Sequence, residues 1–191
     1  MINTYPRGEA IPIDVIRGRL QRLVNHLPDL ALRKACEAVF TKNFFIWPGS
    51  VSKHHVWVGG LAQHVLEVTE TGKHVAERGT GISVPVVAAA CLWHDFGKLW
   101  DIIRNGDAWA HGEHYDRVYH IYRSATEWEK ASKKVSREIR DNVTHCILAH
   151  HGERKYGSPV EPKTLEARIV HHADMLSAWV YQDHPEPKGH K

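Results

Sequence analysis

The sequence has few cysteines, no long apolar run and little net charge of either sign. Its three cysteines, Cys36, Cys91 and Cys146, form no CxxC pair or disulfide framework, so they indicate a reducing compartment such as the cytoplasm. No apolar run approaches the roughly 18 residues that a membrane span needs, so we expect no membrane association. The N-terminal segment lacks the basic stretch and apolar core of a signal peptide. These absences predict a cytoplasmic protein.

The net charge and the length limit the possible binding partners and the number of domains. A net charge of +3 at pH 7 is too small to indicate nucleic-acid binding by itself, and it does not oppose an anionic substrate. The sequence contains no internal repeat, low-complexity segment or shift in composition. Its 191 residues suffice for one domain with a proper hydrophobic core. We therefore predict a single domain at residues 1–184 and a flexible tail at 185–191.

The hydrophobic pattern predicts helices nearly throughout. Apolar residues recur at helical spacing, and Pro, Ser and Gly mark the boundaries of helices at 12–27, 29–44, 59–79, 83–97, and about 114–131, 135–151 and 161–181. The nearly all-apolar segment 83–97 predicts a central buried helix. Asn105-Gly106 between apolar flanks predicts one β-hairpin near residues 100–110. The expected fold is an all-α helical bundle with this one small hairpin.

Histidine is the residue type present in excess, with sixteen copies. Only His184 and His190 lie in the proline-rich tail, so a purification tag does not explain the number. Most of the others lie in the predicted helices.

Histidines and acids occur on successive predicted helices at intervals of about 24 to 30 residues: His64, His94-Asp95, His120, His150-His151 and Asp174. Such residues converge only if the helices pack around a common centre, as in helical bundles that hold metals. Imidazole with carboxylate suits Mn, Fe, Co, Ni or Zn rather than calcium. A lone helical histidine is usually structural, and His94-Asp95 alone fits a satisfied pair at a helix terminus. The complete set indicates a metal site.

The pattern H…HD…H…H…D resembles the HD superfamily of metal-dependent phosphohydrolases, and LWHDFGKLW at 92–100 is similar to its HDxGK signature. The resemblance covers roughly residues 50–180. Within it, residues 54–68 and 145–178 are similar to segments of HD-domain bacterial 3′-to-5′ exoribonucleases, and HD domains of conjugative relaxases carry a related HH…GGL…H run. The exoribonucleases carry an OB domain before the HD domain, whereas about 50 residues, predicted helical, precede it here.

The resemblance implies an HD-type helical bundle with a metal-binding core at 51–181, preceded by helices in 1–50. It implies that one divalent transition metal is held by His64, His94, Asp95 and Asp174. A second metal would be held by His120 and by His150 or His151, with Asp95 bridging. Adjacent helical residues differ by about 100° in direction, so one of His150 and His151 suffices. We favour His150, and ligation by both stays open.

The resemblance also implies catalytic and substrate-binding residues. A metal-bound hydroxide would attack a phosphoester of a nucleotide or short oligonucleotide. Asp95 and Lys98 are the expected catalytic residues, with the Lys98 ammonium stabilising the phosphoryl oxygens. A solvated lysine at a helix end is the alternative for Lys98. His54, His55, Lys98 and Arg154 are the expected substrate-binding residues, although His54, His55 and Arg154 also fit ordinary surface loops.

Two other functions share the same ligand pattern. A small branch of the HD superfamily holds a di-iron centre that activates dioxygen, and a non-catalytic HD module would bind a nucleotide without turnover. The sequence leaves the oligomeric state open. Five tryptophans flank the expected site, and for most of them core packing is more typical than base stacking: Trp47, Trp57, Trp93, Trp100 and Trp109.

Overall fold

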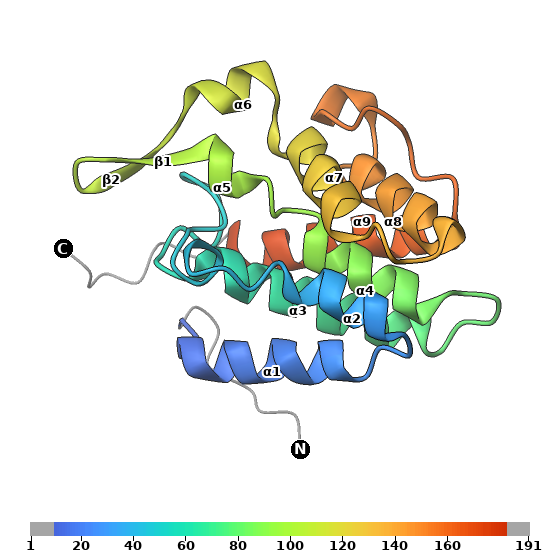
Figure 1. Cartoon of the computed structure of the whole chain (residues 1–191). Coiled ribbons are helices and arrows are strands. Elements are labelled where there is room, and N and C mark those ends of the chain that lie inside the picture. Colours follow the sequence, from blue (N-terminus) through green and yellow to red (C-terminus); the bar gives the residue numbers. More distant parts are fainter. Residues whose placement is uncertain (1–9, 183–191) are drawn as a thin grey trace.

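The computed structural model describes residues 10–182, so the expected tail at 185–191 lies outside the described part of the chain. Figure 1 shows a bundle of helices from which one hairpin projects. The helices are α1 Ile13–Asn25, α2 Leu30–Glu37, α3 Gly60–Ala76, α4 Val84–Trp93, α5 Lys98–Asp101, α6 Glu113–Arg117, α7 His120–Ala131, α8 Arg137–Ala149 and α9 Leu165–Gln182, with short 3₁₀ helices η1 Asn43–Phe45 and η2 Arg154–Tyr156. The strands are β1 Ile102–Asn105 and β2 Ala108–His111. The prediction of an all-α fold with one hairpin is confirmed.

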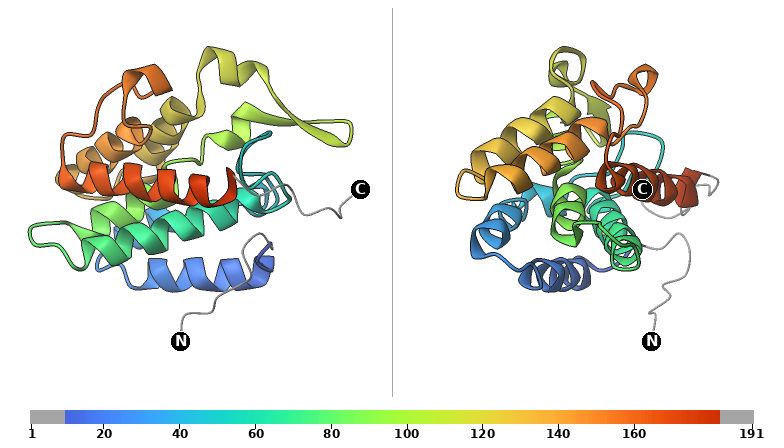
Figure 2. Two further views of the ribbon diagram at one scale, coloured as in Figure 1. Left: turned by 180° about the vertical axis from the view of Figure 1, so that it is seen from behind. Right: turned by 90° about the vertical axis from the view of Figure 1, so that its right-hand side faces the viewer.

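Helix α4 lies at the centre of the bundle, as its all-apolar sequence predicts. Residues 86–93 are all buried, and α4 contacts α2, α3, α7, α8 and α9. Figure 2 (right) shows α4 among these helices. A helix that is apolar on every side must be covered on every side, and this requirement places its C-terminal end inside the protein. Among the described residues, no helix has the length and apolar character needed to cross a membrane.

The N-terminal helices share the core of the histidine-bearing helices. Ile16 and Leu20 of α1 and Leu32 of α2 belong to the same buried cluster as Leu61 of α3. The Arg19 side chain also forms an ion pair with Glu70 of α3. Helices α1 and α2 therefore share one hydrophobic core with the helices that carry the histidines.

Two predicted helices are interrupted within their expected ranges, and the helix expected at 83–97 ends at Trp93. The helix expected at 29–44 ends at Glu37, and a turn and η1 follow it. The helix expected at 114–131 is two helices, α6 and α7, separated by Val118 and Tyr119. Tyr119 has φ +68°, which breaks the helix, and the Asp101 carboxylate accepts the first backbone N–H of α7, from His120 (2.8 Å).

The hairpin turn lies one residue beyond its expected place. Asn105 pairs with Ala108, so the two-residue loop is Gly106-Asp107 rather than Asn105-Gly106. Gly106 has φ +60° at the first loop position, as a type II′ turn requires. The indole of Trp47 donates a hydrogen bond to the carbonyl of Ile102 (2.8 Å) and anchors the base of the hairpin.

Candidate metal centre

Four side chains from three parts of the fold converge beside the end of α4. His64 lies on α3, His94 and Asp95 directly follow α4, and Asp174 lies on α9; all four are buried. The Nε2 atom of His64 lies 3.0 Å from Oδ1 of Asp174 and 3.2 Å from Nε2 of His94. Asp95 Oδ2 lies 3.3 Å from Nε2 of both histidines. Their potential ligand atoms all lie within 4.8 Å of one another, a spacing that fits one metal ion.

A second group of three histidines adjoins the first. His120 begins α7, and His150 and His151 directly follow α8. Their potential ligand atoms also lie within 4.8 Å of one another. Nε2 of His120 and Nε2 of His150 lie 3.5 Å and 3.7 Å from Oδ1 of Asp95. Asp95 thus turns one oxygen toward each group, which is the placement expected of a bridging carboxylate.

Three buried atoms at this junction fit a cation. Oδ1 of Asp95, Nε2 of His120 and Nε2 of His150 make no hydrogen bond within the described residues. A buried polar atom without a partner is costly, and such groups need an ion or a water molecule. A divalent cation held by all three atoms would satisfy them together. The residues therefore fit a metal centre by their own geometry.

The ends of two helices orient two of the imidazoles. His94 and His150 are the C-cap residues of α4 and α8. The Nδ1–H of His94 donates to the carbonyl of Cys91 (2.7 Å), and that of His150 donates to the carbonyl of Ile147 (2.7 Å). These bonds fix Nδ1 as the protonated nitrogen and turn Nε2 toward the centre, as metal-ligating histidines require.

Side-chain partners orient two further imidazoles. Nδ1 of His120 lies 3.1 Å from Oδ2 of Asp101, a buried carboxylate that also pairs with His114 (2.5 Å). Nδ1 of His64 lies 3.0 Å from the hydroxyl of Ser177. Sequence reasoning missed Asp101 and Ser177, because neither stands in a motif and both act through residues far away in the chain.

Electrostatics favour charged carboxylates at the centre. Burial alone would raise the pKa of Asp95, but the ammonium of Lys98 and the imidazole of His94 hold it well below its usual range. Burial alone would raise the pKa of Asp174 too, but the hydrogen bond to His64 and the neighbouring imidazoles together lower it. Burial alone would lower the pKa of His64, yet Asp174 and Asp95 raise it to about 9.

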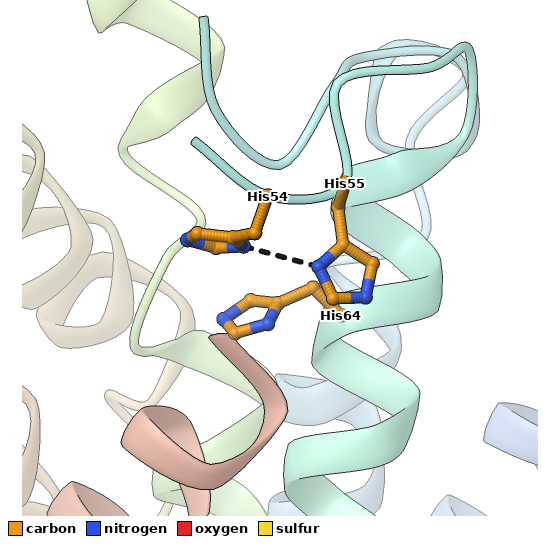
Figure 3. A group of neighbouring side chains, drawn as sticks. All are labelled: His54, His55 and His64. Atoms are coloured by element: carbon orange, nitrogen blue, oxygen red, sulfur yellow. Dashed lines mark hydrogen bonds between the residues drawn. The ribbon is translucent and has the colours of Figure 1, made fainter. Parts of the chain in front are cut away.

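Two histidines of a loop lie over the first group. Figure 3 shows the rings of His54 and His55 gathered with that of His64. Nδ1 of His54 lies 3.0 Å from Nδ1 of His55, and Nε2 of His55 lies 3.1 Å from Glu67 Oε2. These three histidines also stand close enough to bind a metal, but the bond between the two Nδ1 atoms engages both of those nitrogens.

Glycines allow this loop to approach α3 closely. A Cβ atom on Gly60 would lie 2.0 Å from the carbonyl oxygen of His55, and one on Gly49 would lie 2.7 Å from the His55 Cβ. His55 itself has φ +51°, an uncommon backbone conformation for a residue with a side chain. The chain accepts this strain where the loop places two imidazoles at the site.

Burial keeps four imidazoles at and around the centre neutral. It lowers the pKa of His54 to about 2, with further lowering by positive neighbours. It lowers the pKa of His55 to about 4, although Glu67 opposes the shift. It also lowers the pKa of His151 to about 4 and that of His150 well below its usual value. A neutral imidazole has one unprotonated nitrogen that can bind a metal or accept a proton from a substrate, whereas an imidazolium has none.

A cleft of about 820 Å³ opens over the centre, and we use "the cleft" for this space. Its lining includes Asp174 of the first group, His151 of the second, His54 and Lys98. The Lys98 ammonium lies 2.5 Å from Oδ2 of Asp95 and donates to the carbonyl of Gly49 (2.8 Å). The cleft therefore gives a ligand access to both groups and to the Lys98 ammonium.

Two expected binding residues do not line the cleft: His55 is fully buried, and Arg154 lies elsewhere. Arg154 is exposed and lines a separate pocket with His145, Glu161 and Lys163, so the structure does not bring it to the cleft. Among the remaining histidines, His145 accepts a hydrogen bond from the backbone N–H of Lys163. His171 bonds through Nδ1 to the carbonyl of His150 (2.7 Å) and thereby positions the backbone of one expected ligand.

Residues 61–179 match the HD domain family, so the chain belongs to this family. Among curated proteins, it is 29% identical over 161 residues to the 3′-5′ exoribonuclease YhaM of Bacillus licheniformis, covering 83% of this chain and 48% of that protein. It is 25% identical over 177 residues to the 3′-5′ exoribonuclease YhaM of Listeria innocua, covering 89% of this chain and 56% of the relative. The chain thus spans about half the length of these relatives. No solved structure matches it significantly.

These comparisons confirm the family and the fold class predicted from the sequence. Family membership and the exoribonuclease relatives also support the prediction of a hydrolytic enzyme.

Proposed function

We propose that the chain is a metal-dependent phosphohydrolase that cleaves a phosphoester bond of a nucleotide or short oligonucleotide. The observation that carries the proposal is Asp95, whose two oxygens face two separate groups of ligand atoms beneath an open cleft. His64, His94, Asp95 and Asp174 would hold one divalent transition metal, and Asp95, His120, His150 and His151 a second. When bound, such cations lower the pKa of a water molecule and polarise a phosphoryl oxygen.

The protein side chains would bind and orient the phosphoester. Lys98 lines the cleft, and its ammonium can stabilise the negative charge that develops on phosphoryl oxygens. His54 also lines the cleft, and Figure 3 shows its Nε2 directed away from His55 and His64. A neutral His54 could exchange a proton with the substrate through this atom, while His55 holds its Nδ1.

The relatives favour hydrolysis over the other functions that the ligand set permits. Proteins similar to this chain are named as exoribonucleases, which are hydrolytic enzymes acting on nucleic acid. This supports a phosphohydrolase over a di-iron oxygenase or a non-catalytic nucleotide-binding module. The three buried free cysteines agree with a reducing compartment such as the cytoplasm, which remains part of the proposal.

The test compares the protein with its Asp95→Asn variant after reconstitution with Mn, Fe, Co, Ni or Zn. Turnover is measured on bis(p-nitrophenyl) phosphate, mononucleotides and short RNA and DNA oligomers, and bound metal is measured by mass spectrometry. We expect metal-dependent turnover that falls to background in Asp95→Asn. An Asp141→Asn variant, which changes an exposed carboxylate on α8, is the matched control and should retain activity. Absence of turnover from protein that holds two metals would contradict the proposal.

A further inference from the structure

Two of the most exposed aromatic side chains line the cleft. Trp179 on α9 is 55% exposed and Tyr156 in η2 is 60% exposed. Aromatic rings lose the benefit of burial when they face water, so two of them at the rim of a polar site call for a function. Neither residue was singled out from the sequence.

Each aromatic residue is connected to a different ligand group, Trp179 by a shared helix and Tyr156 by a hydrogen bond. Trp179 follows Asp174 by five residues on α9, which corresponds to about 7.5 Å along the helix axis. Tyr156 is tied to the second group, because Nδ1 of His151 bonds to the Tyr156 carbonyl (2.8 Å). Asp95 lies between the two groups. Both rings line the same cleft as Asp174 and His151, so a ligand that contacts both would extend along the cleft past the two groups.

The charges in the cleft suit a chain of phosphates. Lys53, Lys98 and Lys155 line it. The Lys155 ammonium lies 4.9 Å from the centre of the Tyr156 ring and 2.9 Å from Glu153, so the nearby carboxylate is paired. Lysines that neutralise phosphates, combined with aromatic rings that stack on bases, are the elements with which proteins bind single strands without sequence preference.

We propose that the cleft binds single-stranded nucleic acid across the metal centre. One base stacks on Trp179 and another on Tyr156, and the phosphodiester between their nucleotides lies over Asp95. The substrate class is then an oligonucleotide of at least two nucleotides rather than a mononucleotide. This inference rests on the proposed function, because it assumes that the centre acts on a phosphoester.

The test measures binding separately from turnover. Binding of a fluorescently labelled single-stranded octanucleotide to the metal-loaded protein is followed by anisotropy for Trp179→Ala and Tyr156→Ala. We expect each variant to bind about 5- to 150-fold more weakly, which is the range for the loss of one stacked base. Trp179→Phe should restore most of the affinity, because a phenyl ring also stacks. Tyr122→Ala, which removes a 49% exposed ring on α7 outside the lining of the cleft, should bind like the parent protein.

Substrate length gives a second readout. For the parent protein, kcat/KM should rise from mono- to di- and trinucleotide. This rise should be lost in Trp179→Ala and Tyr156→Ala and kept in Tyr122→Ala. Unchanged oligonucleotide affinity in both variants, or equal kcat/KM for mono- and trinucleotides, would overturn the inference while leaving the phosphohydrolase intact. Failure of the proposed function would appear differently, as metal-loaded protein without turnover of any phosphoester.

Discussion

At the residue scale, Asp101 shows how a side chain outside the ligand groups can determine metal binding. Its Oδ2 atom accepts from the backbone N–H of His120 and lies 3.1 Å from Nδ1 of the same residue. One carboxylate thus fixes both the start of α7 and the orientation of an expected ligand.

We expect Asp101→Asn to weaken metal binding by the second group about 10- to 100-fold, because His120 loses its anionic partner. Binding by His64, His94, Asp95 and Asp174 should persist. Calorimetric titration of the metal-free protein, with metal content by mass spectrometry, would separate the two sites. Asp141→Asn is again the control, and two unchanged sites in Asp101→Asn would show that His120 needs no such partner.

At the element scale, the junction between the histidine loop and α3 depends on glycine. We expect Gly60→Ala to lower the free energy of unfolding by about 1–3 kcal/mol, because its Cβ would lie 2.0 Å from a backbone oxygen of His55. Gly18→Ala on α1 is the matched control, since its Cβ approaches only a flexible arginine side chain at 3.6 Å. It should stabilise the protein by up to about 1 kcal/mol.

Urea unfolding followed by circular dichroism measures both values. Equal effects of the two substitutions would mean that the loop can move away from α3 without cost. A destabilised Gly60→Ala protein with normal metal content would place the effect in the loop rather than in the ligand groups.

The sequence predicts some of these structural features and not others. Helix α4 was predictable, because a segment that is apolar on every side has few alternatives to central burial. The break at Tyr119 was not, because the bond that stabilises it joins Asp101 to His120, 19 residues away. The converging histidines could be inferred from one candidate per helix, whereas Arg154 could not be placed, since a loop residue carries no periodic signal.

At the scale of the whole molecule, the buried charges of the ligand groups link metal binding to stability. A cation that binds the folded chain at 100 times its dissociation constant stabilises it by about 2.7 kcal/mol. For a chain of this size, that corresponds to a Tm increase of about 5–10 °C. We expect a chelator to reverse the increase, and Asp95→Asn to show a much smaller one by differential scanning calorimetry. A Tm that does not respond to metal in the parent protein would argue against these ligands.

The bundle also shields its thiols. Cys36, Cys91 and Cys146 are free and buried, and burial raises the pKa of each. Thiolate is the reactive form, so the native protein should not react with a thiol reagent such as dithiobis(nitrobenzoate). Three thiols should react after denaturation. Fast labelling of the native chain would reveal opening of the core around α4 or α8.

The two C-cap histidines have a consequence for the order in which ligands bind. α4 and α8 end at His94 and His150, so the negative ends of two helix dipoles, each equivalent to about half an elementary charge, meet at the centre. Together with Asp95 and Asp174 they attract cations to the centre and oppose the attraction of the nearby Lys98 for a phosphate. We therefore expect ordered assembly: a labelled oligonucleotide should bind the metal-loaded protein more tightly than the metal-free protein, as measured by fluorescence anisotropy.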